Sequence, residues 1–348
     1  MSGVSSFNLF TIFENLTTMK ISQMKSFPMK TRILKNTILE TTVAGFAMAA
    51  AFAGCSDDAT NTVNADANVA VDATVAIDST ATKNVSINFA AMVGAEAFAC
   101  SDNGAAKSYT NLGSADSTAS FKDFRFYVSN VRLIDANSNE VAVTLDQTNF
   151  QFEDVVLLDF EDGTGGCVDL GNTPMNTSVV GQVPAGTYTG LAFDLAVPFD
   201  KNHMEASSVS TPPPLNIMGL FWNWQIGHKY GRVDLVVDGA AGWNVHLGST
   251  GCVSDGTAEA PMVSCGKPNV AKIAISNFDP DSDTVAIDIA ALLVDSDLTV
   301  NAGGPPGCQS FPMDVGDCTP MYPNLGLSFD TGECVDNCVG QTMFKKMN

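Results

Sequence analysis

The residues best suited to metal binding or ligand stacking are concentrated in residues 212–252. All three tryptophans of the chain and two of its three histidines lie in this stretch. Trp222 and Trp224 are two positions apart, so on an extended strand both rings would project from one face. His228 would share that face on an unbroken strand, but Gly227 makes this doubtful because an isolated strand glycine often marks a bulge. Paired rings are typical of core packing or of a sugar-stacking surface.

His203 and His246 are the histidines that we consider first as metal ligands. Imidazole suits copper, and a site of low coordination number with two nitrogens would favour Cu(I). Met204, next to His203, offers a thioether to the same ion, although a loop methionine is more often a packing residue. Each histidine could instead hydrogen-bond a loop carbonyl, and residue type alone does not decide between these roles.

Other chemistry finds little support in the sequence. The motifs G-x-S-x-G, the P-loop and H-E-x-x-H are absent. Ser249 lies near His246, but too few residues accompany them to form a hydrolytic triad. The acidic turn that begins at Asp279 starts like a calcium loop, yet Thr284 replaces the required glycine and Ala290 the bidentate glutamate. We therefore predict that the protein is not an enzyme, and a looser calcium site in this turn has no positive support.

Short alternating segments separated by turn residues predict an all-β fold. No segment after the leader has a sustained 3.6-residue period, which argues against a helical domain. The expected architecture is an antiparallel β-sandwich or barrel-like single domain with long disulfide-stapled loops. We expect this domain over residues 83–330 and a C-terminal tail over residues 331–348. Strands are expected at residues 85–90, 121–134, 141–145, 155–160, 187–197, 233–237, 270–278, 285–293 and 325–329.

The N-terminal residues 1–54 are typical of an export signal. A basic segment begins at Met29, the expected true start, and is followed by an apolar run and small residues that end at Cys55. This order predicts a bacterial lipoprotein with Cys55 as the lipidation site. Because Phe52 replaces the usual leucine of such sites, a signal peptide without lipidation is the alternative. Residues 55–82 have no aromatic residue and are expected to form the lipid anchor and a flexible tether.

The charge balance excludes some partners. The chain has 17 Lys and Arg against 38 Asp and Glu. Such an acidic surface repels nucleic acid and anionic lipid headgroups, so we expect no nucleic-acid partner. It would attract cations and basic proteins, but it also serves solubility.

The nine cysteines fit an exported protein. With Cys55 assigned to the anchor, an even number remains, as disulfides require. Sequence proximity is the only guide to their pairing. It favours Cys252 with Cys265, Cys308 with Cys318, and Cys334 with Cys338. Cys100 and Cys167 then remain as a long-range pair.

Several ordered sequence blocks carry a resemblance to a known family. They are residues 124–134, 157–165, 181–186, 201–203, 221–225 and 246–252. On these blocks the chain resembles the MbnP family, also described as the four-Cys proteins of metallo-mystery pair systems. The resemblance extends over residues 89–327, and Cys252, Cys265, Cys308 and Cys318 correspond to the family's four cysteines.

The resemblance implies a copper-binding lipoprotein on the periplasmic face or outer surface of the outer membrane. It implies that His203 and His246 bind one copper ion, as Cu(I), for copper acquisition or homeostasis. The third ligand would be Trp222, oxidised to kynurenine by a di-haem MbnH-type partner that resembles cytochrome c peroxidases. An indole N–H can only donate a hydrogen bond, whereas the amine of the opened ring has a lone pair.

Three further residues between positions 201 and 228 have no single assigned role in this interpretation. His228, Met204 and Trp224 are candidates for a further ligand or for holding the ligands in place. The alternative function is a carbohydrate- or surface-binding β-sandwich that uses Trp222 and Trp224 as a stacking face.

Overall fold

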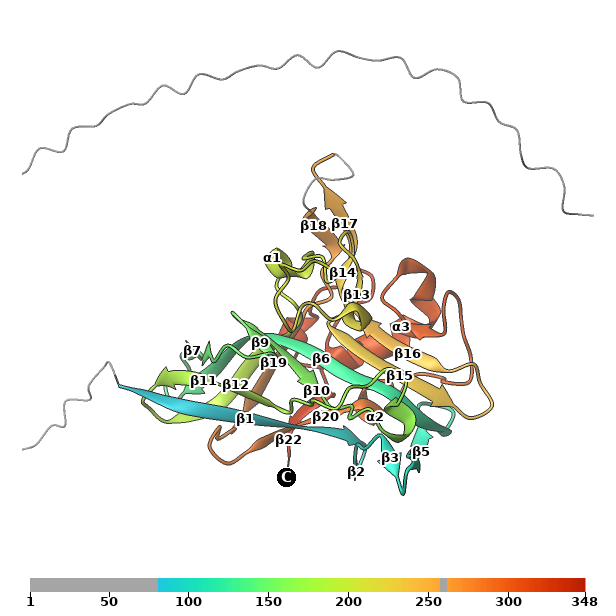
Figure 1. Cartoon of the computed structure of the whole chain (residues 1–348), viewed down its shortest axis with the longest axis horizontal. Helices are drawn as coiled ribbons and strands as arrows, with labels where there is room; N and C mark the ends of the chain where they lie inside the picture. The colour runs from blue at the N-terminus through green and yellow to red at the C-terminus, as the bar shows by residue number, and fades with distance from the viewer. Residues whose placement is uncertain (1–80, 257–261, 348) are drawn as a thin grey trace, which may run out of the picture. The chain divides into compact units, whose positions relative to one another are not determined.

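Strand β6 (Ser117–Asp135) is the longest strand and forms the spine of the larger sheet (Figure 1). The computed structural model describes residues 81–256 and 262–347. β12 (Tyr188–Leu195) and β15 (Gly231–Val237) flank β6 and pair with it antiparallel. The other strands of this sheet are β5 (Ser108–Leu112), β7 (Glu140–Ala142), β9 (Gln151–Phe152), β10 (Val155–Asp159), β16 (Trp243–Leu247), β19 (Ala271–Ser276) and β21 (Gly307–Cys308).

Strand β1 (Thr82–Val93) lies at the centre of the smaller sheet. Its side chains alternate between buried and exposed, as expected for a strand with one face on the core. β11 (Ser178–Pro184) pairs with it antiparallel and β20 (Thr284–Asp288) pairs with it parallel. The remaining strands of this sheet are β2 (Glu96–Ala97), β8 (Thr144–Leu145) and β22 (Phe344–Lys346).

The two sheets share one hydrophobic core, which confirms the predicted all-β sandwich. Phe89 of β1 contacts Phe193 of β12 edge to face, with ring centroids 5.6 Å apart. Phe344 of β22 lies 5.3 Å from the same Phe193 ring. The sandwich is not entirely antiparallel, because β1 with β20 and β16 with β21 are parallel pairs.

Three expected strands differ from the structure. The segment 141–145 is divided between β7, which pairs with β6 in the larger sheet, and β8, which pairs with β11 in the smaller one. The segment 285–293 is a strand only as far as Asp288, whose carboxylate accepts hydrogen bonds from the amides of Ala290 and Ala291 and so caps helix α2 (Ile289–Leu293). The strand expected at 325–329 is wrong. A 3₁₀ helix, η4 (Tyr322–Leu325), ends there at Gly326, whose φ of 72° turns the chain.

The segment after residue 330 belongs to the domain rather than forming a separate tail. β22 pairs antiparallel with β20, so Phe344 lies opposite Ile287. Met343 and Phe344 are buried, and Lys346 forms a 2.7 Å ion pair with Asp283. The predicted domain boundary was therefore too early.

The long loops are stapled as expected, and all four predicted cysteine pairs are disulfides: Cys100–Cys167, Cys252–Cys265, Cys308–Cys318 and Cys334–Cys338. The loops also contain three two-stranded ribbons: β3 (Ser101–Asp102) with β4 (Ala105–Ala106), β13 (Phe221–Asn223) with β14 (Gly227–His228), and β17 (Thr250–Ser254) with β18 (Met262–Lys267). The remaining helical elements are η1 (Gly165–Cys167), α1 (Phe199–Asn202), η2 (Met218–Leu220), η3 (Pro312–Asp314), α3 (Val315–Met321) and η5 (Asp336–Cys338).

Within the two described ranges, no helix is both long and apolar enough to cross a membrane. The predicted export signal, the start at Met29, the lipidation site Cys55 and nearly all of the tether lie outside the described residues.

Candidate metal centre

Helix α1, which precedes His203, is held against the larger sheet by ion pairs. Lys201 Nζ lies 3.0 Å from a carboxylate oxygen of Glu153 and 3.2 Å from one of Asp154, the two residues that join β9 to β10. Asp200 adds a third carboxylate at 2.8 Å. Because Lys201 is itself buried, these pairs fix the helix and with it the start of the His203 loop.

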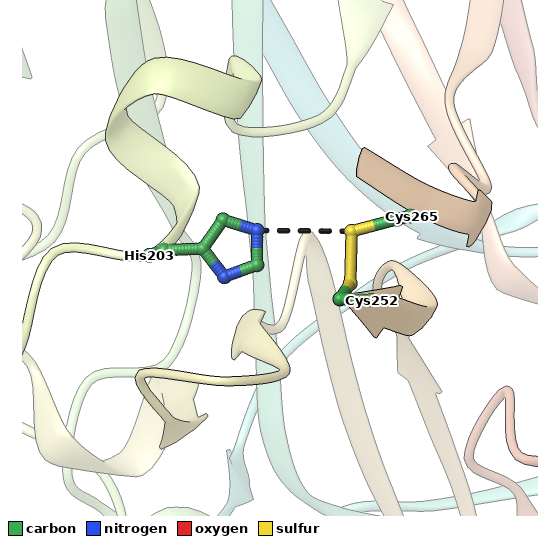
Figure 2. Close-up of side chains that lie close together, drawn as sticks. All are labelled: His203, Cys252 and Cys265. Atoms are coloured by element: carbon green, nitrogen blue, oxygen red, sulfur yellow. Dashed lines mark hydrogen bonds between the residues drawn. A yellow bond between two sulfur atoms is a disulfide. The ribbon is translucent and has the colours of Figure 1, made fainter. Parts of the chain in front are cut away.

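Hydrogen bonding determines which nitrogen of His203 carries the proton. Its Nδ1 lies 2.9 Å from the carbonyl oxygen of Trp224. A carbonyl only accepts, so Nδ1 carries the proton and Nε2 is unprotonated. The side-chain amide of Asn202 also reaches Nε2, at 3.5 Å, which is the outer limit of a hydrogen bond. Burial lowers the pKa of His203, and the bond to Trp224 offsets this in part, which keeps the ring neutral at pH 7. Nε2 faces the disulfide, 3.7 Å from Cys265 Sγ (Figure 2).

His203, Cys252 and Cys265 form a group whose possible ligand atoms all lie within 4.8 Å of one another. The two sulfurs are joined as a disulfide. Thiolate is the form of cysteine that binds metals, so in this state His203 Nε2 is the strong donor of the group. We call these three side chains the His–disulfide cluster.

His246 of β16 is buried and makes a strong hydrogen bond to a carboxylate. Its Nε2 lies 2.6 Å from Asp234 Oδ1. Burial disfavours the charge on Asp234, yet hydrogen bonds from His246 and Arg232 hold the pKa of this carboxyl well below its usual value. Burial also lowers the pKa of His246, which Asp234 raises only in part. The neutral ring therefore donates from Nε2.

The other nitrogen of His246, Nδ1, is buried without a hydrogen-bond partner. An imidazole that donates one N–H to a carboxylate and keeps its second nitrogen bare is the common arrangement of a metal-binding histidine. His246 thus keeps one nitrogen without a hydrogen-bond partner, and its role as a metal ligand stays a prediction.

Trp222 and Trp224 do not share a strand face, so this expectation is wrong. β13 ends at Asn223, whose side-chain oxygen accepts hydrogen bonds from the amides of Gln225 and Ile226, both at 2.9 Å. This turn reverses the chain into β14 and separates the two tryptophans. Trp224 contributes its carbonyl to His203, whereas the partly buried Trp222 ring packs on another part of the chain.

The Trp222 ring packs on the segment that follows His246. It contacts the ring of Phe311, with centroids 5.2 Å apart, and lies so close to Gly248 that a β-carbon there would clash with it. Gly248 follows His246 by two positions, which on an extended chain face the same side. Lys229 Nζ is 5.8 Å from the centre of the Trp222 ring and also interacts electrostatically with His246.

His203 approaches this segment only indirectly. The preceding residue, Asn202, donates a 2.9 Å hydrogen bond to Ser249 Oγ, next to Gly248. In the described part of the chain, no hydrogen bond or ring contact joins His203 to His246 or to Trp222. The contacts of the described residues therefore place Trp222 at Gly248, two positions after His246, and place His203 at the disulfide, but they join none of the three side chains directly.

His228 and Met204 have packing roles. His228 is fully buried, with Nδ1 2.8 Å from the carbonyl of Asn202 and Nε2 2.9 Å from that of Leu215. Each nitrogen faces a backbone carbonyl in a buried site, so His228 ties these two segments together and neither nitrogen is open to a metal. Met204 is partly buried and packs against the hydrophobic core.

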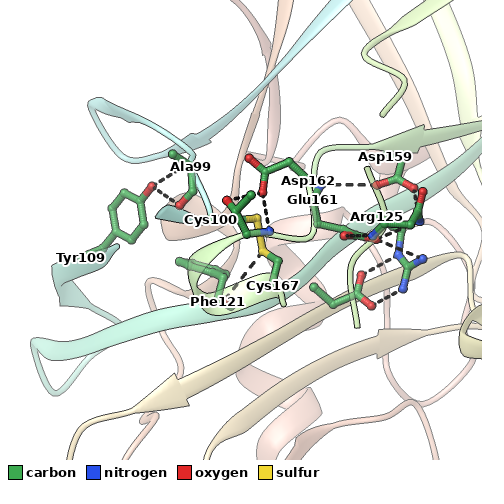
Figure 3. Close-up of a disulfide and its surroundings, with 12 residues drawn as sticks. Ala99, Cys100, Tyr109, Phe121, Arg125, Asp159, Glu161, Asp162 and Cys167 are labelled. Carbon is green, nitrogen blue, oxygen red and sulfur yellow. Dashed lines mark hydrogen bonds and ion pairs between the residues drawn. A yellow bond between two sulfur atoms is a disulfide. The ribbon is translucent and has the colours of Figure 1, made fainter. Parts of the chain in front are cut away.

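A buried network of ionisable side chains extends from His246 into the larger sheet, and it was not predicted from the sequence. Its members, in order of contact, are His246, Asp234, Arg232, Asp123, Arg125 and Glu161. The available signal was residue spacing. Asp123 and Arg125 are two positions apart and so share one face of their strand, and Arg232 and Asp234 share one face of theirs in the same way. Figure 3 shows Arg125 and Glu161 beside Asp159, close to the Cys100–Cys167 disulfide.

Glu161 should make the stability of the protein depend on pH. Burial, followed by repulsion from Asp159, raises the pKa of Glu161 to about 8. A raised folded-state pKa means that the stabilisation is complete below the unfolded value of about 4.3 and is lost as pH rises towards 8. The Gln side chain of Glu161→Gln cannot ionise, so the variant should not lose this stabilisation. Its free energy of unfolding should therefore rise relative to that of the wild type from pH 5 to pH 8.

Urea denaturation at several pH values in this range measures the effect. Glu140→Gln is the control, because Glu140 is an exposed partner of Arg132 and its replacement should leave the slope unchanged. Parallel curves for wild type and Glu161→Gln would contradict the assignment.

The acidic turn considered for calcium is occupied by lysines. Asp281 pairs with Lys83 at 2.8 Å and Asp283 with Lys346 at 2.7 Å. Asp279 accepts hydrogen bonds within the turn. The three carboxylates therefore serve as ion-pair and hydrogen-bond partners in a surface turn.

Comparison with known proteins identifies the family. The MbnP family model matches residues 82–310. A solved structure, MbnP from Methylosinus trichosporium, is 29% identical in sequence and superposes with a TM-score of 0.63, covering 76% of this chain and 98% of that one. No curated protein sequence matches the chain. With the sandwich, the disulfides and a family match over most of the described residues, the chain belongs to the MbnP family.

Proposed function

We propose that this protein binds one copper ion as cargo, for copper acquisition or homeostasis, and catalyses no reaction itself. The observation that carries the proposal is the pair of neutral imidazoles, each with one nitrogen held by an oxygen acceptor and the other left with its lone pair. His203 Nε2 is half-buried, and His246 Nδ1 is buried and unpartnered. Two nitrogen donors and few others suit Cu(I).

Trp222 is the proposed source of the third donor. Its ring is partly exposed and packs against Gly248, two positions after His246, with Lys229 beside it. Indole itself cannot bind the metal, because its nitrogen lone pair belongs to the ring. Oxidation to kynurenine would supply an amine, and a di-haem partner of the MbnH type is the proposed oxidant. Closure of the site also requires the His203 loop to approach Trp222 and His246.

The proposed location is the periplasmic face or the outer surface of the outer membrane, with the lipid anchor at Cys55. The four disulfides support an oxidising compartment. The strongly acidic chain would favour encounters with cations and with a basic partner.

The mass of the Trp222 peptide tests the modification. In protein produced with the di-haem partner, we expect the peptide that contains Trp222 to carry the mass of kynurenine, while the Trp224 and Trp243 rings remain unmodified. Protein produced alone should show an unmodified peptide and bind copper more weakly. Full copper affinity with an intact Trp222 ring would contradict the proposed third ligand.

The carbohydrate-binding alternative has lost its main support. It required Trp222 and Trp224 to form one stacking face, and the turn at Asn223 separates them. Glycan binding that survives chelators and the loss of both His203 and His246 would restore it.

A further inference from the structure

The Cys252–Cys265 disulfide differs from the other three in its access to solvent. Each of the other disulfides includes at least one buried cysteine, namely Cys100 and Cys167, Cys308 and Cys318, and Cys338. Cys252 and Cys265 are both partly exposed. Cys265 also lines a surface pocket of about 300 Å³ beside Pro198 and Ser249. Exposed disulfides are the labile ones in thiol–disulfide exchange.

The ribbon that carries this disulfide would keep its geometry after reduction. Cys252 and Cys265 are directly opposite each other on β17 and β18, with paired residues on both sides of them. At the base of the ribbon, Lys267 Nζ donates a 2.6 Å hydrogen bond to the carbonyl of Phe329, and Thr250 Oγ1 bonds to that of Ser310. Cross-strand hydrogen bonding would therefore hold the two thiols near each other (Figure 1).

His203 turns its unprotonated nitrogen towards these sulfurs. The Trp224 carbonyl fixes the proton on Nδ1, so Nε2 is unprotonated, and it faces Cys265 Sγ at 3.7 Å (Figure 2). The Asn202 amide reaches Nε2 only at 3.5 Å, a long contact that a metal ion would replace. Asn202 holds the loop from the other side through Ser249 and His228. The imidazole is thus in place before any metal arrives.

We propose that reduction of Cys252–Cys265 converts the His–disulfide cluster into a second metal site, of His and two Cys ligands, for a soft d¹⁰ cation. The reductant is a dithiol. Its thiolate attacks one sulfur of the disulfide, its second thiol releases the mixed disulfide, and two electrons and two protons pass to Cys252 and Cys265. Metal binding then releases both protons to solvent and leaves one imidazole and two thiolates on the ion.

This site is distinct from the proposed copper site, although His203 serves both. Oxidised protein would offer nitrogen donors only, whereas reduced protein would add two thiolates. The fourth position of a tetrahedral ion would face solvent, which is the arrangement of an exchangeable rather than a closed structural site. The disulfide would then act as a switch between two donor sets.

Cadmium binding tests the proposal, because thiolate-to-cadmium charge transfer absorbs in the ultraviolet and reports sulfur ligation directly. The full chain, produced without a di-haem partner, is treated with limiting dithiothreitol and desalted. Alkylation mapping should find Cys252 and Cys265 free before any other pair. The protein should then bind one equivalent of Cd²⁺ with the charge-transfer band, and untreated protein should show no band.

Three variants separate the ligands. Cys252→Ser with Cys265→Ser should abolish the band. His203→Ala should weaken Cd²⁺ binding about 10-fold or more, since it removes a ligand. His246→Ala should bind Cd²⁺ like the wild type, although it would lose the proposed copper site. Prior opening of another disulfide, no band after reduction, or wild-type affinity in His203→Ala would each overturn the proposal without bearing on His246 and copper.

Discussion

Replacing either His203 or His246 with alanine should weaken Cu(I) binding by about 100-fold or more. Loss of residues that only hold ligands costs roughly 10- to 100-fold in metal affinity, and these two side chains are the proposed ligands themselves. Each has one nitrogen engaged with an oxygen acceptor, the Trp224 carbonyl for His203 and Asp234 for His246. Alanine removes the remaining lone pair and leaves no substitute donor.

The measurement is competition with a chromophoric Cu(I) chelator, on protein produced with its di-haem partner. Ascorbate rather than a thiol keeps copper reduced, so that the Cys252–Cys265 disulfide stays intact. Met204→Leu is the matched control, because Met204 adjoins His203 but packs on the core. Unchanged affinity in His246→Ala would remove that residue from the site, and a loss in Met204→Leu equal to that in His203→Ala would indicate a thioether ligand.

Replacing Arg125 with methionine should lower the free energy of unfolding by about 3–5 kcal/mol, which is typical when one partner of a buried ion pair is removed. Arg125 is 3% exposed, and it binds Asp123 through two nitrogens and Glu161 at 3.3 Å. Methionine fills much of the same volume but leaves the Asp123 carboxylate without its main counter-ion, and it removes a hydrogen-bond donor from Glu161. The charge on Asp123 would then depend on Arg232 alone, at 3.2 Å.

Arg132→Met provides the comparison on the same strand. Arg132 pairs with Glu140 at 2.7 Å, but it lies nearer to solvent than Arg125 and Glu140 is exposed. Such pairs contribute about 0–1 kcal/mol. Chemical denaturation of the two variants should therefore give a large and a small loss. Equal losses in the free energy of unfolding would contradict the structure, because they would mean that the buried Arg125 contributes no more than the more exposed Arg132.

Much of the fold could be predicted from sequence because alternation is a local signal. The strands β6, β12 and β19 were predicted close to their observed positions. Closeness in sequence was enough to pair the cysteines of three disulfides, and Cys100 and Cys167 were the pair left over. Asp288 shows where the local signal fails. The apolar residues after it suit a strand as well as a helix, and only the capping carboxylate decides in favour of α2.

The candidate site could be predicted only in part, because its geometry depends on residues far apart in sequence. The spacing of Trp222 and Trp224 suggested one face, but the hydrogen bonds of Asn223 turn the chain between them. The role of Asp234 in directing His246 required the register of β15 with β16. No pattern in the sequence sets His203 opposite Cys265, since this contact depends on how α1 and the β17–β18 ribbon pack.

X-ray absorption at the copper edge of the disulfide-intact, copper-loaded protein tests the central claim most directly. The account predicts a first shell of nitrogen, with the outer-shell scattering of two imidazoles and no sulfur. A shell with sulfur at bonding distance, or with fewer than two imidazoles, would contradict the assignment of His203 and His246 as the copper ligands.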